Sequence, residues 1–134
     1  MNSISPEYYK VFIDLQQKEA QLNWTRNNYF LVTSSFLLLA LSQLNFPVTT
    51  FLSGAGIAIN IIWLFIQHRS NKYTGYYKKK ADEIKPADAP EVYPSNLGGF
   101  QMRYLVYFLP ISFILIWSLV IIGDLSLFIS NLLK

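Results

Sequence analysis

A run of 41 residues, 27–67, contains no charged side chain. As one continuous helix this run would measure about 60 Å, roughly twice the hydrocarbon thickness of a bilayer. Polar residues cluster near its middle and end at Pro47, and proline interrupts a helix because it lacks the amide donor and restricts the residue before it. The run therefore predicts a tight hairpin of two membrane-spanning helices, 29–46 and 48–66.

A second charge-free stretch, 104–123, is 20 residues long and is followed by Asp124, which we expect to be an exposed acid at the outer interface. About 20 apolar residues suffice to cross the hydrocarbon core as a helix, whereas a barrel needs many short alternating strands. Only 14% of the residues are charged, against about a quarter in soluble domains. The predicted fold class is an all-α integral membrane protein with three transmembrane helices, a tight first hairpin and an N-terminal amphipathic helix.

The N-terminal segment, 1–28, is predicted to be that amphipathic helix, cytoplasmic or interfacial. Apolar residues recur along it at helical spacing, and a polar face that we expect to stay wet lies opposite. The apolar stripe is Tyr8, Phe12, Leu15 and Leu22, and the polar face is Gln16, Gln17, Gln21 and Asn23. Two arrangements stay open: a helix lying on the membrane surface, or one projecting into the cytoplasm and bundling with copies of itself.

Two further segments lie outside the predicted spans. We expect 67–103 to be a basic cytoplasmic helix followed by a Pro/Gly linker, and 124–134 to be a short outer tail. Of the 11 Lys and Arg residues, three lie before the first span, seven in 67–103, none in the hairpin turn and one at the C-terminus. Because basic loops stay in the cytoplasm, the N-terminus is predicted to be cytoplasmic and the C-terminus periplasmic or extracellular.

Aromatic residues flank the predicted spans. Amphipathic rings are enriched at headgroup depth, so the candidate interface anchors are Trp24, Tyr29, Trp63 and Tyr104. The basic run Lys78, Lys79 and Lys80 could attract anionic lipid, a nucleotide or nucleic acid. We interpret it as a topology signal that also attracts lipid headgroups, and we do not expect nucleic acid as a partner.

Residues that could carry chemistry are sparse. The sequence has no cysteine and one histidine, His68, which excludes thiolate sites and disulfides. It contains no glycine-rich phosphate loop after a strand, no nucleophile elbow and no His/Glu pair at metal-ligand spacing. The chain is therefore predicted to be non-enzymatic, without cofactor or metal; an enzyme of lipid metabolism is the weakest of the alternatives.

The second predicted span carries a small and polar face. Its members step by 4, 3, 4 and 7 residues, which places them on one side of a helix; these oligomer or pore-face candidates are Thr49, Ser53, Gly56, Asn60 and Gln67. Small residues permit close helix approach, and polar ones hydrogen-bond across an interface. Two interpretations stay open: packing of the hairpin and of copies against each other, or a polar pore lining formed when copies assemble. Two other strips are Gly54 with Ala58, and Asn28, Ser35 and Ser42.

A long N-terminal helix, a tight hairpin over 29–66 and a basic helical continuation from Gln67 together resemble the SLATT group of small bacterial membrane effectors. The resemblance covers about two thirds of the chain and is architectural. It implies a location in the bacterial inner (plasma) membrane, homo-oligomerisation, and membrane disruption in nucleotide-signalled antiviral defence.

The predicted function is that of a small non-enzymatic multi-pass membrane protein that homo-oligomerises, as a pore-forming or membrane-disrupting effector. In that prediction Ser53 and Asn60 line or seal the assembly. The alternative is an accessory or anchoring subunit of a larger membrane complex. The predicted partners are membrane lipids and further copies of the chain, together with a cytoplasmic protein or a signalling nucleotide.

Overall fold

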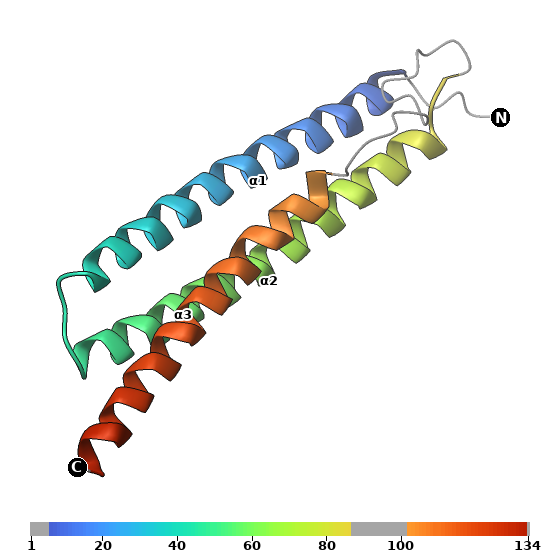
Figure 1. Ribbon diagram of the computed structural model, residues 1–134. Coiled ribbons are helices and arrows are strands. Elements are labelled where there is room, and N and C mark those ends of the chain that lie inside the picture. The colour runs from blue at the N-terminus through green and yellow to red at the C-terminus, as the bar shows by residue number, and fades with distance from the viewer. Residues whose placement is uncertain (1–5, 87–101, 134) are drawn as a thin grey trace.

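Three long helices make up the computed structural model, which describes residues 6–86 and 102–133. They are α1 (Pro6–Leu41), α2 (Val48–Glu83) and α3 (Met102–Leu132). Figure 1 shows α1 and α2 as an antiparallel hairpin, with α3 running back along α2. The central helix, α2, packs against both others, whereas α1 and α3 touch only marginally. The prediction of an all-α chain is confirmed for the described residues; most of the predicted Pro/Gly linker lies outside them.

The first helix is continuous over 36 residues, about 54 Å. It begins with Pro6, whose fixed φ suits a first helical turn, and its N-terminal half extends directly into the predicted first span. It ends at Leu41, five residues before the predicted end at 46. Residues 42–44 instead form tight turns, with amide donors directed at carbonyls three residues back.

Two of the three helices are long and apolar enough to cross a membrane, Val48–Glu83 and Val106–Leu132. The apolar part of α1, 29–41, has only 13 residues, about 20 Å at 1.5 Å per residue. The structure thus provides two candidate spans, and the prediction of three is confirmed in part.

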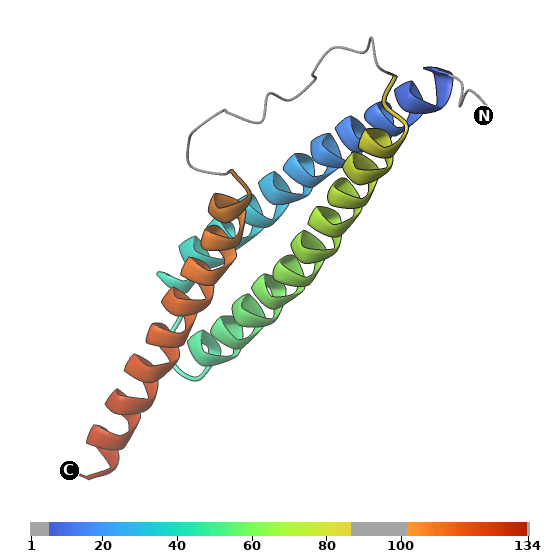
Figure 2. The same cartoon turned by 90° about the vertical axis from the view of Figure 1, so that its right-hand side faces the viewer.

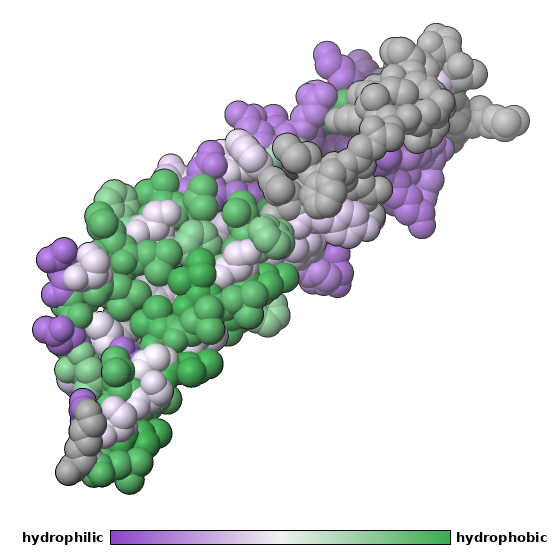
Figure 3. Space-filling model, viewed as in Figure 1, coloured by the Kyte–Doolittle hydropathy of each residue, from purple (hydrophilic) through white to green (hydrophobic). Residues whose placement is uncertain are grey.

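The molecule has an apolar half and a polar half. Figure 3 shows hydrophobic residues covering the half that contains the hairpin turn and the C-terminus, and hydrophilic residues covering the other. Figure 2 shows that α1 and α2 continue past the start of α3 as a two-helix arm. A hydrogen bond of 2.7 Å from Ser70 to Glu19 joins the two helices in this arm, so the N-terminal part of α1 stays paired with α2.

The interior is largely polar, while large apolar side chains are exposed on all three helices. Lipid offers no advantage for burying apolar groups, so helices in it associate through small residues and interhelical hydrogen bonds. The buried apolar residues are Trp63, Ala81, Val106 and Trp117. The buried polar residues are Gln16, Asn27, Ser34, Thr49, Ser53, Asn60, Gln67 and Ser70.

This arrangement corrects one expectation for the N-terminal helix. Gln16, predicted to lie on the wet face, is buried, and Asn23 is half-buried, whereas Tyr8 and Leu22 of the apolar stripe are exposed. The reason is that Gln16 and Asn27 lie on the buried side of α1 and Asn27 bonds Trp63 of α2, so part of the polar face is turned toward the neighbouring helix.

Candidate functional site

The small and polar face of α2 lies inside the protomer. Thr49, Ser53, Gly56, Asn60 and Gln67 are all buried. Their hydrogen-bond partners and close neighbours outside α2 come from α1 and α3 of the same chain. The structure therefore gives this face an intramolecular role, packing of the hairpin and of α3. Any role of these five residues between copies of the chain stays a prediction.

In the middle of this face, the side chains of Asn60 and Ser34 satisfy each other's hydrogen-bonding groups. The Asn60 side-chain amide donates to Ser34 Oγ of α1 at 3.2 Å and to the Gly56 carbonyl at 2.8 Å. Ser34 Oγ also lies 3.4 Å from Asn60 Oδ1. Both side chains are fully buried. An unpaired amide in hydrocarbon costs several kcal/mol, about the amount that this contact avoids, so the pair fixes the facing positions of α1 and α2.

Trp63 was predicted to be an interface anchor at headgroup depth, but it is fully buried within the protomer. Its indole N–H donates to Asn27 Oδ1 at 2.6 Å, and its ring stacks on Phe30 with centroids 5.5 Å apart. Phe113 of α3 lies 6.5 Å away. The ring therefore joins all three helices instead of facing headgroups.

The other three predicted anchors, Trp24, Tyr29 and Tyr104, are exposed. Their rings lie outside the protomer core, as headgroup contact requires, and their depth in a membrane stays a prediction.

Gly56 is the point at which α3 comes closest to α2. A Cβ atom added at Gly56 would collide with the indole ring of Trp117, which is fully buried. Only glycine leaves room for this ring, so the residue at position 56 determines how closely α3 packs. Gly54 is different, because a Cβ there meets nothing within 4 Å.

Asp124 lies level with the start of α2, half-buried, which corrects the expectation of an exposed acid. Its carboxylate accepts hydrogen bonds from the hydroxyls of Thr49 and Thr50. Both threonines are in the first turn of α2, where the helix dipole favours a negative charge. The carboxylate therefore ties α3 to the start of α2, beside an open cleft of about 320 Å³ that reaches the hairpin turn.

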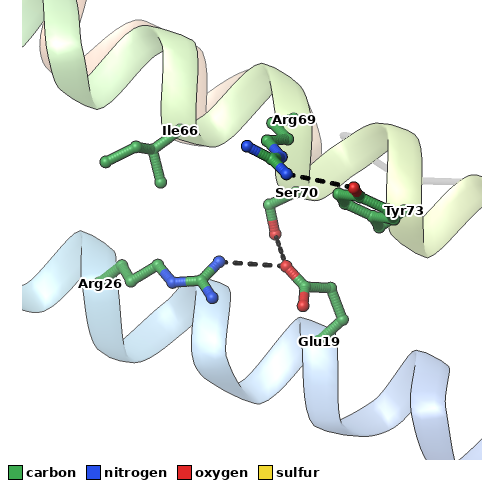
Figure 4. Close-up of a pocket in the computed structure, with 6 residues that line it drawn as sticks. All are labelled: Glu19, Arg26, Ile66, Arg69, Ser70 and Tyr73. Carbon is green, nitrogen blue, oxygen red and sulfur yellow. Dashed lines mark hydrogen bonds and ion pairs between the residues drawn. The ribbon is translucent and has the colours of Figure 1, made fainter.

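A second open cleft, of about 490 Å³, lies between α1 and α2 where the apolar half meets the polar arm. Figure 4 shows its lining residues: Glu19, Arg26, Ile66, Arg69, Ser70 and Tyr73. One oxygen of Glu19 accepts from Arg26 at 3.1 Å and from Ser70 at 2.7 Å. Arg69 donates to the Tyr73 hydroxyl at 3.3 Å and lies over the Tyr73 ring.

Sequence reasoning did not single out this cleft. A signal was present, since Arg26 immediately precedes the 41-residue charge-free run and Arg69 follows it two residues later. Two helices of a hairpin must bring such flanking residues to the same level. What the sequence could not give is the rotation of each helix, which determines that both guanidinium groups border one cleft.

The basic run lies further along the polar arm. Lys78 and Lys79 are exposed, and Lys80 pairs with Glu83 at 2.7 Å. The hydrogen bond between them raises the pKa of Lys80 and lowers the pKa of Glu83. The structure brings the three lysines to the end of α2, away from both clefts. Among the described residues, no three His, Cys, Asp or Glu side chains are grouped so as to hold a metal ion.

Comparison with known proteins gives one match. The model of a family described as the octameric membrane protein family (8xMP) matches residues 6–126, which include α1, α2 and most of α3. No curated protein and no solved structure is significantly similar to the chain. The resemblance to the SLATT group stays a prediction.

Proposed function

Because this chain belongs to the octameric membrane protein family, we propose that it functions as an assembly of eight identical copies embedded in a membrane. The observation that carries the proposal is the family match over most of the chain, together with two helices apolar and long enough to span. The large apolar side chains exposed along α2 and α3 need lipid or further copies to cover them.

The proposed assembly accommodates α1 as the third spanning helix. Its apolar part is short, but α1 is paired with α2 along its whole length, and neighbouring copies would shield its other side from lipid. The distribution of Lys and Arg supports an orientation with the polar arm and the N-terminus in the cytoplasm of a bacterial cell and the C-terminus outside, because basic segments stay in the cytoplasm. The proposal involves no catalysed reaction.

Contacts between copies are proposed to use the exposed strip of α2 that contains Gly54 and Ala58. Both residues are exposed in the protomer, and a side chain at Gly54 would meet nothing within 4 Å. Small residues four apart allow two helix backbones to approach closely within lipid. This strip lies on α2 apart from the buried face, so it is free to contact a second copy while the buried face holds the protomer together.

A bulky residue at Gly54 tests this contact without disturbing the protomer. Leucine favours a helix by about 1 kcal/mol over glycine, and the space around Gly54 is open, so Gly54→Leu should fold normally. We expect wild-type protein in mild detergent to show a mass eight times the 15.5 kDa of one chain, and Gly54→Leu to shift to smaller species, measured by native mass spectrometry.

The matched control is Gly123→Leu, at another apolar-helix glycine with nothing within 4 Å, which should remain octameric. If the wild-type protein is monomeric at every protein concentration, the octameric assembly is wrong and the accessory-subunit alternative is favoured. If the Gly54→Leu variant is still octameric, the contact between copies does not use this strip.

Membrane permeabilisation is a second candidate, favoured by a polar line on the free side of α1. Asn28 and Ser35 of α1 and Ser42, directly after its end, recur every seven residues and are all exposed, whereas the polar face of α2 is already occupied. Eight copies with α1 turned toward the axis would line a lumen with this strip, as a defence or lysis effector requires. In cells expressing the chain, dye uptake that is lost in Gly54→Leu and kept in Gly123→Leu would support it; equal exclusion of dye by all three would oppose it.

A further inference from the structure

The cleft between α1 and α2 carries a positive charge that the protomer leaves uncompensated. Arg26 is paired with Glu19 through a salt bridge of 3.1 Å. Arg69 has no carboxylate partner among the described residues; its contacts are the hydroxyl and the ring of Tyr73. The cleft lining therefore contains two guanidinium groups and one carboxylate, a net charge of +1, with several N–H donors of Arg69 unused.

The cleft lies where the charged and the uncharged parts of α1 and α2 meet. Arg26 and Arg69 are the arginines that flank the charge-free run 27–67, so the cleft lies at the boundary between the two halves of the molecule in Figure 3. On the apolar side it is bordered by Ile66. One turn of α2 from Arg69 into the apolar half, Phe65 is 71% exposed. A polar group in the cleft would continue directly onto an apolar surface.

Charge and level together point to an amphiphilic anion. We propose that this cleft binds the phosphate group of an anionic membrane lipid, with Arg69 as its main ligand and Arg26 as a second cationic neighbour. Guanidinium groups bind phosphate through paired N–H donors, and basic pockets between transmembrane helices on the cytoplasmic side hold anionic headgroups. The acyl chains would lie along α2 past Phe65. The inference rests on the membrane placement in the proposed function.

The internal contacts of the cleft prepare it for this ligand. Ser70 and Arg26 both bond the same oxygen of Glu19, which fixes the carboxylate on the side of the cleft formed by α1. Arg69 lies over the Tyr73 ring and donates to its hydroxyl (Figure 4), and these two contacts hold its guanidinium in position. Phe65 and Ala58 are seven residues apart, on one face of α2 and about 10 Å apart along the helix, so acyl chains that pass Phe65 would lie beside the contact between copies proposed at Gly54 and Ala58.

Native mass spectrometry of the protein released from lipid nanodiscs tests the proposal, because lipid retention and oligomeric mass are read in the same spectrum. The nanodiscs contain phosphatidylcholine with or without phosphatidylglycerol. We expect wild type to retain phosphatidylglycerol selectively, and Arg69→Gln to reduce that retention about tenfold, the effect of losing one charge-assisted contact. Glu19→Gln removes the competing carboxylate and should increase retention.

Lys79→Gln is the matched control, since it removes the same charge from the exposed basic run, and it should bind phosphatidylglycerol as wild type does. Equal retention by wild type and Arg69→Gln, or an equal loss in Lys79→Gln, would overturn the proposal. Displacement of the lipid by millimolar inorganic phosphate would also overturn it, since the site would then be one for free phosphate. An intact octamer without bound lipid refutes this inference alone, whereas the absence of an octamer refutes the proposed assembly.

Discussion

At the scale of single residues, packing depends on a few positions at which a small or polar side chain has one specific neighbour. Asn60 is hydrogen-bonded to Ser34, and Trp63 to Asn27. Gly56 lies against the ring of Trp117. Each pair joins two helices, and each involves a residue that is fully buried. In a membrane, where apolar burial provides no driving force between helices, such pairs carry the specificity of the fold.

Gly56 gives the sharpest prediction at this scale. Because an added methyl group would collide with Trp117, Gly56→Ala must displace α3, at a cost of about 1–3 kcal/mol, typical of overpacking. We expect a lower midpoint of thermal unfolding in detergent, followed by tryptophan fluorescence. Gly123→Ala, with open space around it, should be as stable as wild type or slightly more so. Equal midpoints for the two variants would contradict the close packing of α3 on α2.

At the scale of helices, α2 has a seam that repeats in steps of four and three. Its buried members are Thr49, Ser53, Gly56, Asn60, Trp63, Gln67 and Ser70. This is the spacing of a coiled-coil interface, but here the seam is filled mostly by small and polar residues. One seam serves two partners, since Ser34 of α1 and Trp117 of α3 both contact it.

Asp124 attaches α3 to the start of α2, and its replacement should therefore lower the stability of the protein. Its carboxylate accepts from two threonine hydroxyls of α2, so Asp124→Leu leaves Thr49 buried without this acceptor. We expect a loss of about 1–2 kcal/mol, seen as a lower thermal midpoint, and a smaller loss for Asp124→Asn, which keeps an acceptor oxygen. The control is Asn131→Leu, at an exposed position near the same cleft. An equal loss of stability in this control would mean that the polarity of this end of the molecule matters and the threonine contacts do not.

At the scale of the whole molecule, the chain has an apolar half and a polar arm (Figure 3), and the apolar half is the part that the proposed function embeds in a membrane. The continuity of α1, and its pairing with α2 inside the arm, favour the projecting arrangement over a helix lying on the surface. In the proposed arrangement, with α1 as a third spanning helix, the two chain ends would lie on opposite sides of the membrane.

The natural absence of cysteine makes this topology simple to test, because a single introduced thiol is the only one. In intact cells, a membrane-impermeant maleimide should label Gln43→Cys in the hairpin turn and should leave Lys79→Cys in the arm unlabelled. After permeabilisation both should react, which controls for accessibility. Labelling of Lys79→Cys alone in intact cells would invert the proposed orientation.

The sequence by itself determined the helical class, the hairpin and the level of the polar boundary. The reason is that every backbone group within lipid must be bonded inside its own segment, so the length of an apolar run specifies a helix and the position of Pro47 specifies a reversal. The periodicity of Thr49, Ser53, Gly56 and Asn60 also identified correctly one face of one helix.

Only the tertiary structure decided what covers that face. Periodicity shows which residues share a side of a helix but carries no information about the neighbour, and the same small and polar face would suit another helix of the chain, a second copy or a pore. Trp63, Asp124 and Gln16 were misplaced for this reason: each is amphipathic or polar, which in a sequence favours a boundary or solvent. In the folded chain Trp63 and Asp124 each bond a partner from another helix, whereas Gln16 is enclosed although its side-chain oxygen has no hydrogen-bond partner among the described residues.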